Sequence, residues 1–419
     1  MYRLILALTL SAVALTSARG DDKPILTKGG RLVIAGDSIT EQKLYSRYME
    51  TYLTACHPEL DLWILQLGWG GERAPGFANR MEFDLLAFMP TVVTTCYGMN
   101  DGSYQAYKDS IGAEYKKHMT SIVRRAKKAG ATVVVGSPGA VDLHFFKNPN
   151  LKPEVYNDNL AHLRDIAKAL AADESQVFAN VHDAMHSTMV AAQEKMGDKY
   201  PVCGGDGFHP GPNGQLIMAY AFLKALKVDG TIAEIAVDLN ADAKATPGHT
   251  IVSAQNGVIE IESVRYPFCH FGDPKSAGST RSILPFLPFD QDLNRFTLIV
   301  LNLKSDKATV MWGKEKKTFT KAQLEKGVNL AAEFPDNPFA AAFQNVDKMV
   351  AAKQTYETNL IKNYHAALRG MMNEIGNDDA VSAAVQTIVP KLHAKQAKLS
   401  ADARAAVVPV KHTIRVIPE

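Results

Sequence analysis

Between residues 30 and 228 the chain alternates short apolar runs with longer segments of helical periodicity. The expected strands are the apolar, largely β-branched runs at 31–35, 61–67, 91–96, 131–136 and 176–181. Runs that are apolar throughout, separated by helical lengths, are typical of a parallel sheet buried on both faces. The pattern predicts an α/β fold: a three-layer α/β/α domain with a five-stranded parallel sheet, whose ligands bind at the carboxyl ends of the strands.

After residue 229 the pattern changes. Shorter β-rich runs with turn residues between them indicate an antiparallel unit, and the expected strands lie within 249–266, 295–303, 307–313, 316–320 and 407–419. A long helical stretch from Phe339 to Lys398, broken near 376–379, interrupts them. We therefore expect an α/β domain over residues 19–229 and a β-rich accessory module with long helices over 230–419.

The N-terminus has the features of a secretory signal peptide. One cation, Arg3, precedes an apolar run from Leu4 to about Leu15, and small residues follow up to Ala18. The alternative is an N-terminal membrane anchor, but the run is short for a span and has no charged stop. We expect cleavage after Ala18 and export to the periplasm or the cell exterior, with no membrane span in the mature chain.

Charge and cysteine content exclude several classes of protein. The 46 basic and 44 acidic residues leave a net charge of +2, so nothing favours nucleic acid or an anionic membrane surface as a partner. Four cysteines in an exported chain allow three full disulfide pairings of Cys56, Cys96, Cys203 and Cys269. Cys96 lies in an apolar run and is expected to be a small buried residue. No C-x-x-C occurs, so a cysteine metal site has no support.

Polar residues follow the expected strands where ligands of such a sheet bind. Ser38 lies at the first strand-to-helix turn, where helix N–H groups favour negative charge, and a glycine-rich stretch at 68–71 follows the second strand. Asn100 follows the third, and a loop with Asp206 and His209 precedes the last helix. A Gly-Asp-Ser tripeptide alone is more often a turn or an N-cap. Together, however, these residues supply a nucleophile, a base, an orienting acid and oxyanion donors, as acyl transfer requires.

Two Asp-x-x-His pairs compete for the role of acid and base. Asp206 and His209 lie in "GGDGFHPGPNGQ", where Gly207 permits a tight bend and Pro210 stops any helix. Such a loop can turn the Asp206 carboxylate onto the His209 ring, which frees Nε2 to take a serine proton. The other pair, Asp183 and His186, is expected at the end of the fifth strand and the start of a helix. We therefore favour His209 as the base.

A zinc site is the second interpretation of the upstream pair. His182 and His186 are four residues apart, as in the motif H-E-x-x-H, with Asp183 in place of the glutamate. That motif needs both histidines on one helix face, whereas His182 is expected to end a strand, and aspartate is one methylene short. We expect no metal and no organic cofactor.

Four sequence blocks resemble those of the SGNH (GDSL-type) hydrolase family: "GDSIT" at 36–40, "GWGG" at 68–71, "GMND" at 98–101 and "DGFHP" at 206–210. The resemblance covers roughly residues 30–228 and implies an SGNH/flavodoxin-like fold. It implies that Ser38 is the nucleophile, His209 the base and Asp206 the residue that orients it. It also implies an oxyanion hole made of the Ser38 N–H, the Gly71 N–H and the Asn100 side-chain amide.

Two points of the resemblance stay open. Gly70 could replace Gly71 as the donor, because spacing alone does not separate them. Gln66 stands where the family often has asparagine, which affects the support of the loop and not the chemistry. No Gly-x-Ser-x-Gly elbow occurs in the chain, which disfavours the α/β-hydrolase plan.

The sequence thus predicts a secreted serine esterase that works through an acyl-serine, with short acyl (acetyl) esters on carbohydrate as substrates by family analogy. Alternatives are a lipase or lysophospholipase, an acyltransferase with the same residues, and a non-catalytic surface protein that binds glycan. The last is disfavoured because a decayed site usually loses a member. The expected partner is a small-molecule or polysaccharide ester, and the oligomeric state is left open.

Overall fold

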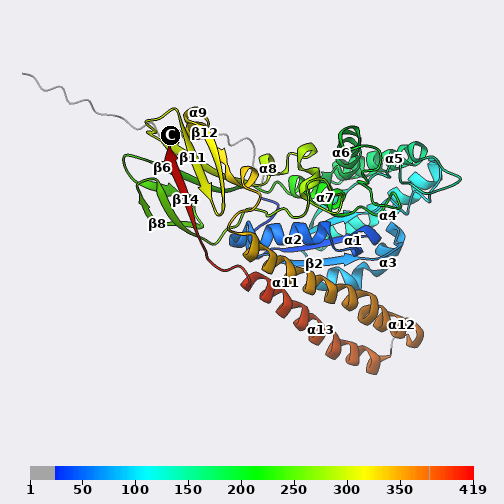
Figure 1. The fold of residues 1–419 in the computed structure, drawn as a ribbon. Helices are drawn as coiled ribbons and strands as arrows, with labels where there is room; N and C mark the ends of the chain where they lie inside the picture. The colour runs from blue at the N-terminus through cyan, green and yellow to red at the C-terminus, as the bar shows by residue number, and fades with distance from the viewer. Residues whose placement is uncertain (1–23, 377) are drawn as a thin grey trace, which may run out of the picture.

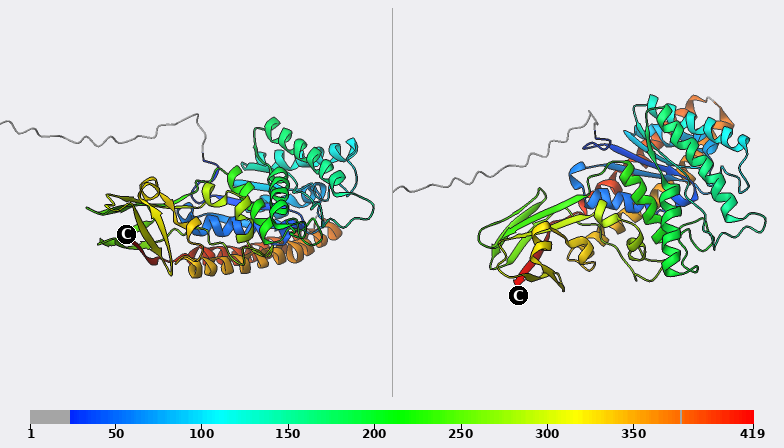
Figure 2. Two further views of the ribbon diagram at one scale, coloured as in Figure 1. Left: turned by 45° about the horizontal axis from the view of Figure 1, so that its top comes forward. Right: turned by 90° about the horizontal axis from the view of Figure 1, so that it is seen from above.

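The computed structural model describes residues 24–376 and 378–419. The expected signal peptide, residues 1–18, lies outside the described residues. An α/β part occupies one end of the molecule and a β-rich part the other, and a helical hairpin runs along the α/β part (Figures 1 and 2).

The first sheet is parallel and has five strands in the order β2-β1-β3-β4-β5, as predicted. Its strands are β1 (Arg31–Gly36), β2 (Trp63–Gly68), β3 (Val92–Cys96), β4 (Thr132–Gly136) and β5 (Val177–Ala179). Alternate residues of β1 enter different apolar cores: Leu32 belongs to one cluster and Val33 to the other. Both faces of the sheet are therefore buried, which explains why the strands are apolar throughout.

Helices cover both faces of this sheet and complete the predicted three-layer α/β/α arrangement (Figure 1). They are α1 (Ser38–Glu41), α2 (Tyr45–Ala55), α3 (Ala74–Asp84), α4 (Asp109–Lys128), α5 (Pro153–Asp173), α6 (Val181–Met196) and α7 (Pro212–Ala225), with 3₁₀ turns at Pro58–Leu60 and Leu86–Phe88. Residues of α2 and α7 join one core cluster, and residues of α3 and α4 join the other. Because all five strands are parallel, the loops that follow them lie at the same carboxyl edge of the sheet.

The C-terminal region is β-rich, as expected, but it forms two sheets. One has the order β13-β10-β6-β7 and the other β12-β11-β14-β9-β8. Their strands are β6 (Thr231–Asp238), β7 (Ala243–Ala245), β8 (His249–Gln255), β9 (Val258–Ser263), β10 (Arg295–Leu301), β11 (Lys307–Trp312), β12 (Glu315–Thr320), β13 (Val328–Asn329) and β14 (Val410–Pro418). Short helices in this region are Arg281–Phe286, α8 (Phe289–Asp292), α9 (Lys321–Lys326) and α10 (Leu330–Glu333).

The expectation of one antiparallel unit was wrong for β10. This strand pairs in parallel with β6 and belongs to the four-stranded sheet. Its inward residues, such as Phe296, Leu298 and Val300, alternate with less buried ones, and this period of two does not encode the direction of the partner strand.

The helical hairpin (residues 340–405) consists of α11 (Ala340–Asn359), a π-helical segment (Leu360–His365), α12 (Ala366–Ile375) and α13 (Asp379–Ala405). The predicted helical stretch and its break near 376–379 are confirmed. The hairpin packs against α2 and β2 of the α/β part, beside the open edge of the parallel sheet (Figure 1). Glu357 and Gln396 contact the edge strand: the Gln66 N–H donates to Glu357 Oε2 at 3.1 Å, and Gln396 Nε2 donates to Ile64 O at 3.3 Å. Side chains of the hairpin thus satisfy an edge that another strand could otherwise extend.

All four cysteines are buried and carry free thiols, Cys96 among them as expected. Burial raises the pKa of the Cys269 thiol to about 12, so it stays protonated. Among the residues described, no helix is both long enough and apolar enough to cross a bilayer.

Candidate active site

Ser38 lies where β1 ends and the short helix α1 begins. Asp37 caps that helix: its Oδ1 accepts the Ile39 N–H at 3.0 Å. The cap turns the chain sharply out of the sheet and leaves the serine hydroxyl at the carboxyl edge. Ser38 Oγ lies 2.8 Å from His209 Nε2, although the two residues are 171 positions apart in the chain.

His209 and Asp206 lie in the loop between α6 and α7. Asp206 Oδ2 lies 2.7 Å from His209 Nδ1, and Asp206 Oδ1 accepts the N–H groups of Phe208 and His209 at 3.1 and 3.0 Å. A carboxylate beside Nδ1 fixes the proton on that nitrogen, so Nε2 is free to accept the Ser38 proton. The structure therefore brings Ser38, His209 and Asp206 into one hydrogen-bonded chain.

Glycine makes this loop possible at two positions. Gly204 has φ +84°, and a Cβ there would lie 1.9 Å from the His209 carbonyl oxygen. Gly207 has φ +87°, and a Cβ there would lie 2.3 Å from the backbone of Phe146. A side chain at either position would push the loop outward. The two glycines therefore allow the tight loop that brings Asp206 next to His209.

The carboxyl groups around the site differ in their electrostatics. Burial acts to raise the pKa of Asp206, but hydrogen bonds from the His209 ring and from the backbone of His209 and Phe208 outweigh it, and the pKa is lowered. Asp206 is therefore an anion at neutral pH. Burial raises the pKa of Asp37 to about 7, although the Ile39 N–H opposes the shift, and the neighbouring Asp101 adds to it. Near pH 7 the Asp37 carboxyl behind the serine is therefore only partly ionised, whereas the Asp206 carboxyl behind the histidine is an anion.

Gly71 and Asn100 follow β2 and β3, the two strands that flank β1. Asn100 Nδ2 donates to the Glu72 carbonyl oxygen at 3.1 Å and lies 3.4 Å from Asp37 Oδ2. The Gly70 N–H donates to the Glu41 carboxylate. The Gly71 N–H, in a residue with φ +73°, meets no acceptor among the described residues. Of the two glycines that the spacing left open, Gly71 is the one with an unused donor.

Gln66 supports this loop in its own way. Its side-chain oxygen accepts the Gly68 N–H, and its Nε2 donates to Thr358 Oγ1 of the hairpin at 3.2 Å. The residue is fully buried. Gln66, which stands where the family often has asparagine, therefore also hydrogen-bonds to Thr358 of α11.

The upstream Asp-His pair does not join this site. His182 lies in the first turn of α6, which Asn180 caps, so the expectation that His182 ends a strand was wrong: β5 stops at Ala179. The rings of His182 and His186 stack with centroids 6.0 Å apart, and Asp183 pairs with Arg164 on the surface. Within residues 24–376 and 378–419, no group of three or more His, Cys, Asp or Glu side chains could hold a metal ion.

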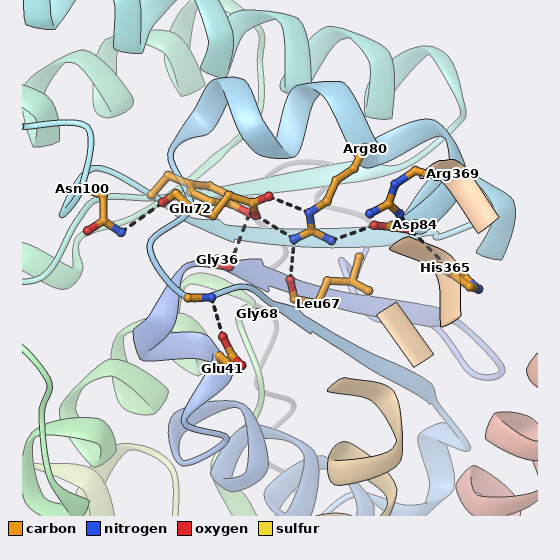
Figure 3. Close-up of polar contacts among 12 residues, drawn as sticks. Gly36, Glu41, Leu67, Gly68, Glu72, Arg80, Asp84, Asn100, His365 and Arg369 are labelled. Atoms are coloured by element: carbon orange, nitrogen blue, oxygen red, sulfur yellow. Dashed lines mark hydrogen bonds and ion pairs between the residues drawn. The ribbon is translucent and has the colours of Figure 1, made fainter. Parts of the chain in front are cut away.

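Sequence reasoning missed the charged residues that surround the glycine-rich loop. Arg80 holds the Glu72 carboxylate through two nitrogens at 2.7 Å each (Figure 3). Tyr97 donates to the same carboxylate at 2.8 Å. Both Arg80 and Glu72 are buried. The signal was present in "GGER": an acidic residue directly after a glycine turn needs a partner when the loop is covered. The partner's identity was not readable, because it lies in the following helix among other polar residues.

Comparison with known proteins finds relatives of the α/β part. Residues 34–217 match the model of the GDSL-like lipase/acylhydrolase family. An acetylxylan esterase of Geobacillus stearothermophilus is 23% identical over 220 residues, which cover 47% of this chain and 94% of that protein.

Solved structures extend the likeness in fold. That of a gut microbial diltiazem-metabolizing enzyme superposes with a TM-score of 0.70 at 21% identity and covers 94% of this chain and 98% of its own. The structure of the Geobacillus stearothermophilus acetylxylan esterase Axe2 covers 49% of this chain and 97% of its own, with 20% identity and a TM-score of 0.41. The family match covers most of the α/β part. Residues 34–217 therefore form a domain of the SGNH (GDSL-type) hydrolases, a family of serine ester hydrolases.

Proposed function

We propose that Ser38, His209 and Asp206 are the nucleophile, the general base and the orienting acid of ester hydrolysis through an acyl-serine. The observation that carries the proposal is the continuous chain from Ser38 Oγ to His209 Nε2 at 2.8 Å and from His209 Nδ1 to Asp206 Oδ2 at 2.7 Å. Distances of this size lie within the reach that proton transfer between nucleophile and base requires.

The reaction has two halves. Ser38 Oγ bonds to the ester carbonyl carbon while its proton moves to His209 Nε2, and the carbonyl electron pair moves onto the oxygen. Collapse of this adduct expels the alcohol, which takes the proton from His209. Water then attacks the acyl-serine with the same help and releases the acid. Asp206 keeps the ring in the productive tautomer and stabilises the imidazolium.

The oxyanion donors in this proposal are the N–H groups of Ser38 and Gly71 and the side-chain amide of Asn100. Gly71 is preferred to Gly70 because the Gly70 N–H already serves Glu41. Asn100 Nδ2 is held by the Glu72 carbonyl oxygen at 3.1 Å and makes a longer hydrogen bond to Asp37 Oδ2 at 3.4 Å, so in this proposal the oxyanion replaces Asp37 as the second acceptor. A donor that is fixed before the reaction contributes roughly 3 kcal/mol to the lowering of the barrier.

For the substrate, we propose short acyl esters, acetyl above all, on carbohydrate. The support is the acetylxylan esterase relative, which is 23% identical over 47% of this chain. A lipase or lysophospholipase remains the runner-up in specificity, and acyl transfer to a second alcohol would use the same residues. Export to the periplasm or cell exterior is part of the proposal and rests on the signal-like N-terminus.

The decisive experiment compares the wild type with Ser38→Ala. The wild type is expected to hydrolyse p-nitrophenyl acetate and to be labelled by a fluorophosphonate at Ser38, which peptide mass spectrometry would locate. Ser38→Ala is expected to lose both properties. Full activity of Ser38→Ala, or labelling at another serine, would overturn the assignment.

A second assay tests the substrate. Release of acetate from acetylated xylan is compared with hydrolysis of p-nitrophenyl palmitate at equal enzyme concentration. The proposal expects turnover of the acetylated glycan and little of the long-chain ester. The reverse order would replace it with the lipase alternative, and an enzyme inert toward every ester would favour a glycan-binding protein without catalysis.

A further inference from the structure

Three sets of contacts join the helical hairpin to the glycine-rich loop at residues 68–73, called here the oxyanion loop. The first passes through Glu41, three residues after Ser38 in α1. Its carboxylate accepts the Gly70 N–H with one oxygen, and its other oxygen lies 2.7 Å from Lys362 Nζ. Lys362 belongs to the π-helical segment. The helix that carries the serine, the oxyanion loop and the hairpin therefore meet at one carboxylate.

The second set passes through Arg80 of α3 (Figure 3). Besides Glu72, Arg80 binds the Leu67 carbonyl oxygen at 2.8 Å and Asp84 Oδ2 at 3.1 Å, so it holds both ends of the oxyanion loop. Asp84 Oδ1 in turn accepts from Arg369 and lies 3.1 Å from His365 Nδ1, both on the hairpin. Asn100 is the other end of this chain, since its amide is held by the Glu72 carbonyl oxygen.

The third set lies at β2, just before the loop. Lys353 of α11 is fully buried between Glu50 and Glu357, at 2.9 and 2.6 Å. Glu357 accepts the backbone N–H of Gln66, which fixes the strand that leads into the oxyanion loop. The hairpin thus contacts β2 through Gln66, the anchor of the loop through Asp84 beside Arg80, and α1 through Glu41.

The π-helical segment explains how one helix can supply all of them. The contacting residues on the hairpin are Glu357, Lys362, His365 and Arg369, spaced by five, three and four. A regular α-helix repeats every 3.6 residues, so a gap of five would turn Lys362 off the common face. The wider i→i+5 turn of a π-bulge restores it, and such bulges are frequent at functional sites.

Burying several charged side chains costs free energy, because each loses its hydration. Arg80, Asp84, Lys353 and Glu357 are each at most about one-twentieth exposed. Burying ions rarely improves stability over apolar packing of the same volume, whereas hydrogen-bonded ions fix direction as well as distance. Such a network is well suited to holding the direction of an N–H and an amide within a fraction of an ångström.

We infer that the stretch 357–369 of the hairpin is a brace of the oxyanion hole, with Glu41, Glu72 and Arg80 as positioning residues for Gly71 and Asn100. The inference rests on the proposed function, because it assigns a purpose to the donors named there. It gives residues 357–369 of the hairpin a positioning role for the oxyanion hole of the α/β part. Loss of the brace leaves substrate binding in place and weakens only the contacts that form as the oxyanion develops.

The test uses Lys362→Met in the full chain, with Lys348→Met as the control. Lys348 is exposed on the same hairpin, so its replacement removes the same charge away from the oxyanion loop. We measure kcat and KM on p-nitrophenyl acetate per Ser38 site titrated with fluorophosphonate, and the affinity for phenylboronic acid. The boronate adduct of Ser38 places a tetrahedral oxygen where the oxyanion forms.

The expected result for Lys362→Met is a kcat about tenfold lower and a boronate affinity weakened in proportion, at unchanged KM. Lys362→Arg, which keeps the positive charge, is expected to retain most of the wild-type kcat. Lys348→Met is expected to behave as the wild type. In a Glu41→Gln background Lys362→Met adds little further, because both act through one carboxylate.

A wild-type kcat for Lys362→Met would overturn the inference, as would a loss explained wholly by fewer titratable sites or by a raised KM. These outcomes are separate from a failure of the proposed function. That failure appears in the wild type, as activity surviving Ser38→Ala, and needs no hairpin variant to detect.

Discussion

His209 Nδ1 lies 2.7 Å from Asp206 Oδ2, and the same carboxylate accepts the backbone N–H of His209 through its other oxygen. One carboxylate therefore fixes both the ring and the main chain of the residue that contacts Ser38. The acid and the base lie only three positions apart in the sequence, because Gly207 lets the loop fold back. The side chains of Asp206 and His209 remain partly exposed, at 45% and 28%, so solvent reaches the pair.

Asp206→Asn tests this relationship. The amide can donate to Nδ1 and so stabilise the wrong tautomer, with the proton on Nε2, where it cannot accept from Ser38. We expect kcat on p-nitrophenyl acetate to fall on the order of a thousandfold, somewhat less than for a fully buried acid. The measurement is steady-state kinetics at pH 7 to 8.

The matched control for Asp206→Asn is Asp183→Asn, the acid of the other Asp-x-x-His pair. It lies on α6 beside Arg164 and should leave kcat within about twofold of the wild type. Equal losses in the two variants would contradict the choice of His209 over His186 as the base.

Asn100→Ala is expected to lower kcat by roughly 10² to 10³ at nearly constant KM. The amide hydrogen bond to the developing oxyanion is lost, while the ground-state carbonyl makes little use of it. Asn150→Ala, at an exposed loop position, serves as the control. A variant whose KM rises while kcat stays constant would show that Asn100 binds substrate and does not stabilise the oxyanion.

The parallel sheet and the loop around His209 were both predictable from the sequence. Continuous apolar runs identify strands buried on two faces, and the element limits agreed to within a few residues. The Asp206–His209 contact is local, and the residue types Gly, Pro and Asp that shape it carry their own conformational preferences. Features that depend on a short stretch of sequence, such as strand positions and this loop, could therefore be predicted from the sequence.

Contacts between distant segments could not be predicted in this way. The docking of the hairpin depends on Tyr356, Leu360 and Ile361, which join the core behind the sheet, yet any amphipathic helix has such residues. The Lys362–Glu41 pair spans 321 residues, and nothing near either residue indicates the other. The direction of β10 was missed for the same reason, since the pairing partner decides it and not the strand itself.

Lys353→Met is expected to lower the free energy of unfolding by about 3–5 kcal/mol. Removing the ammonium leaves Glu50 and Glu357 buried together without a counter-ion, and the cost of an unpaired buried charge exceeds that of the lost contact. Urea denaturation followed by circular dichroism measures the change. Lys348→Met, an exposed lysine of the same helix, is the control and should stay within about 0.5 kcal/mol of the wild type.

A loss below about 1 kcal/mol for Lys353→Met would contradict this account. It would mean that one of the two carboxyl groups takes up a proton at little cost when the lysine is absent. The double variant Lys353→Met/Glu357→Gln separates the two cases. If both carboxylates stay charged when the lysine is absent, removing the Glu357 charge should recover part of the lost stability.

The last prediction concerns acid and rests on a buried chain of hydrogen bonds between the two C-terminal sheets. Trp312 Nε1 donates to His412 Nδ1 at 3.2 Å, and an indole N–H can only donate, so His412 carries its proton on Nε2. That proton is shared with Ser263 Oγ at 2.9 Å, and Ser263 lies 2.8 Å from His249 Nδ1. His249 Nε2 completes the chain at the Ile232 carbonyl oxygen, 2.9 Å away. Neither imidazole can take a second proton without breaking a bond of the chain.

Burial, and then the nearby His249, lower the pKa of His412 to about 3, and burial also lowers the pKa of His249. In the unfolded chain both titrate near pH 6.5. Below that pH the unfolded state binds protons that the folded state refuses, so stability is complete above pH 6.5 and falls as the pH drops toward the folded pKa. Each histidine contributes a slope of up to about 1.4 kcal/mol per pH unit in this window. Urea unfolding between pH 7.5 and 4.5 should show the wild type losing stability more steeply than His412→Gln, whose amide can keep both hydrogen bonds without titrating. Equal slopes for the two proteins would mean that the chain of bonds accepts a proton and that the imidazole of His412 is not held neutral by its burial.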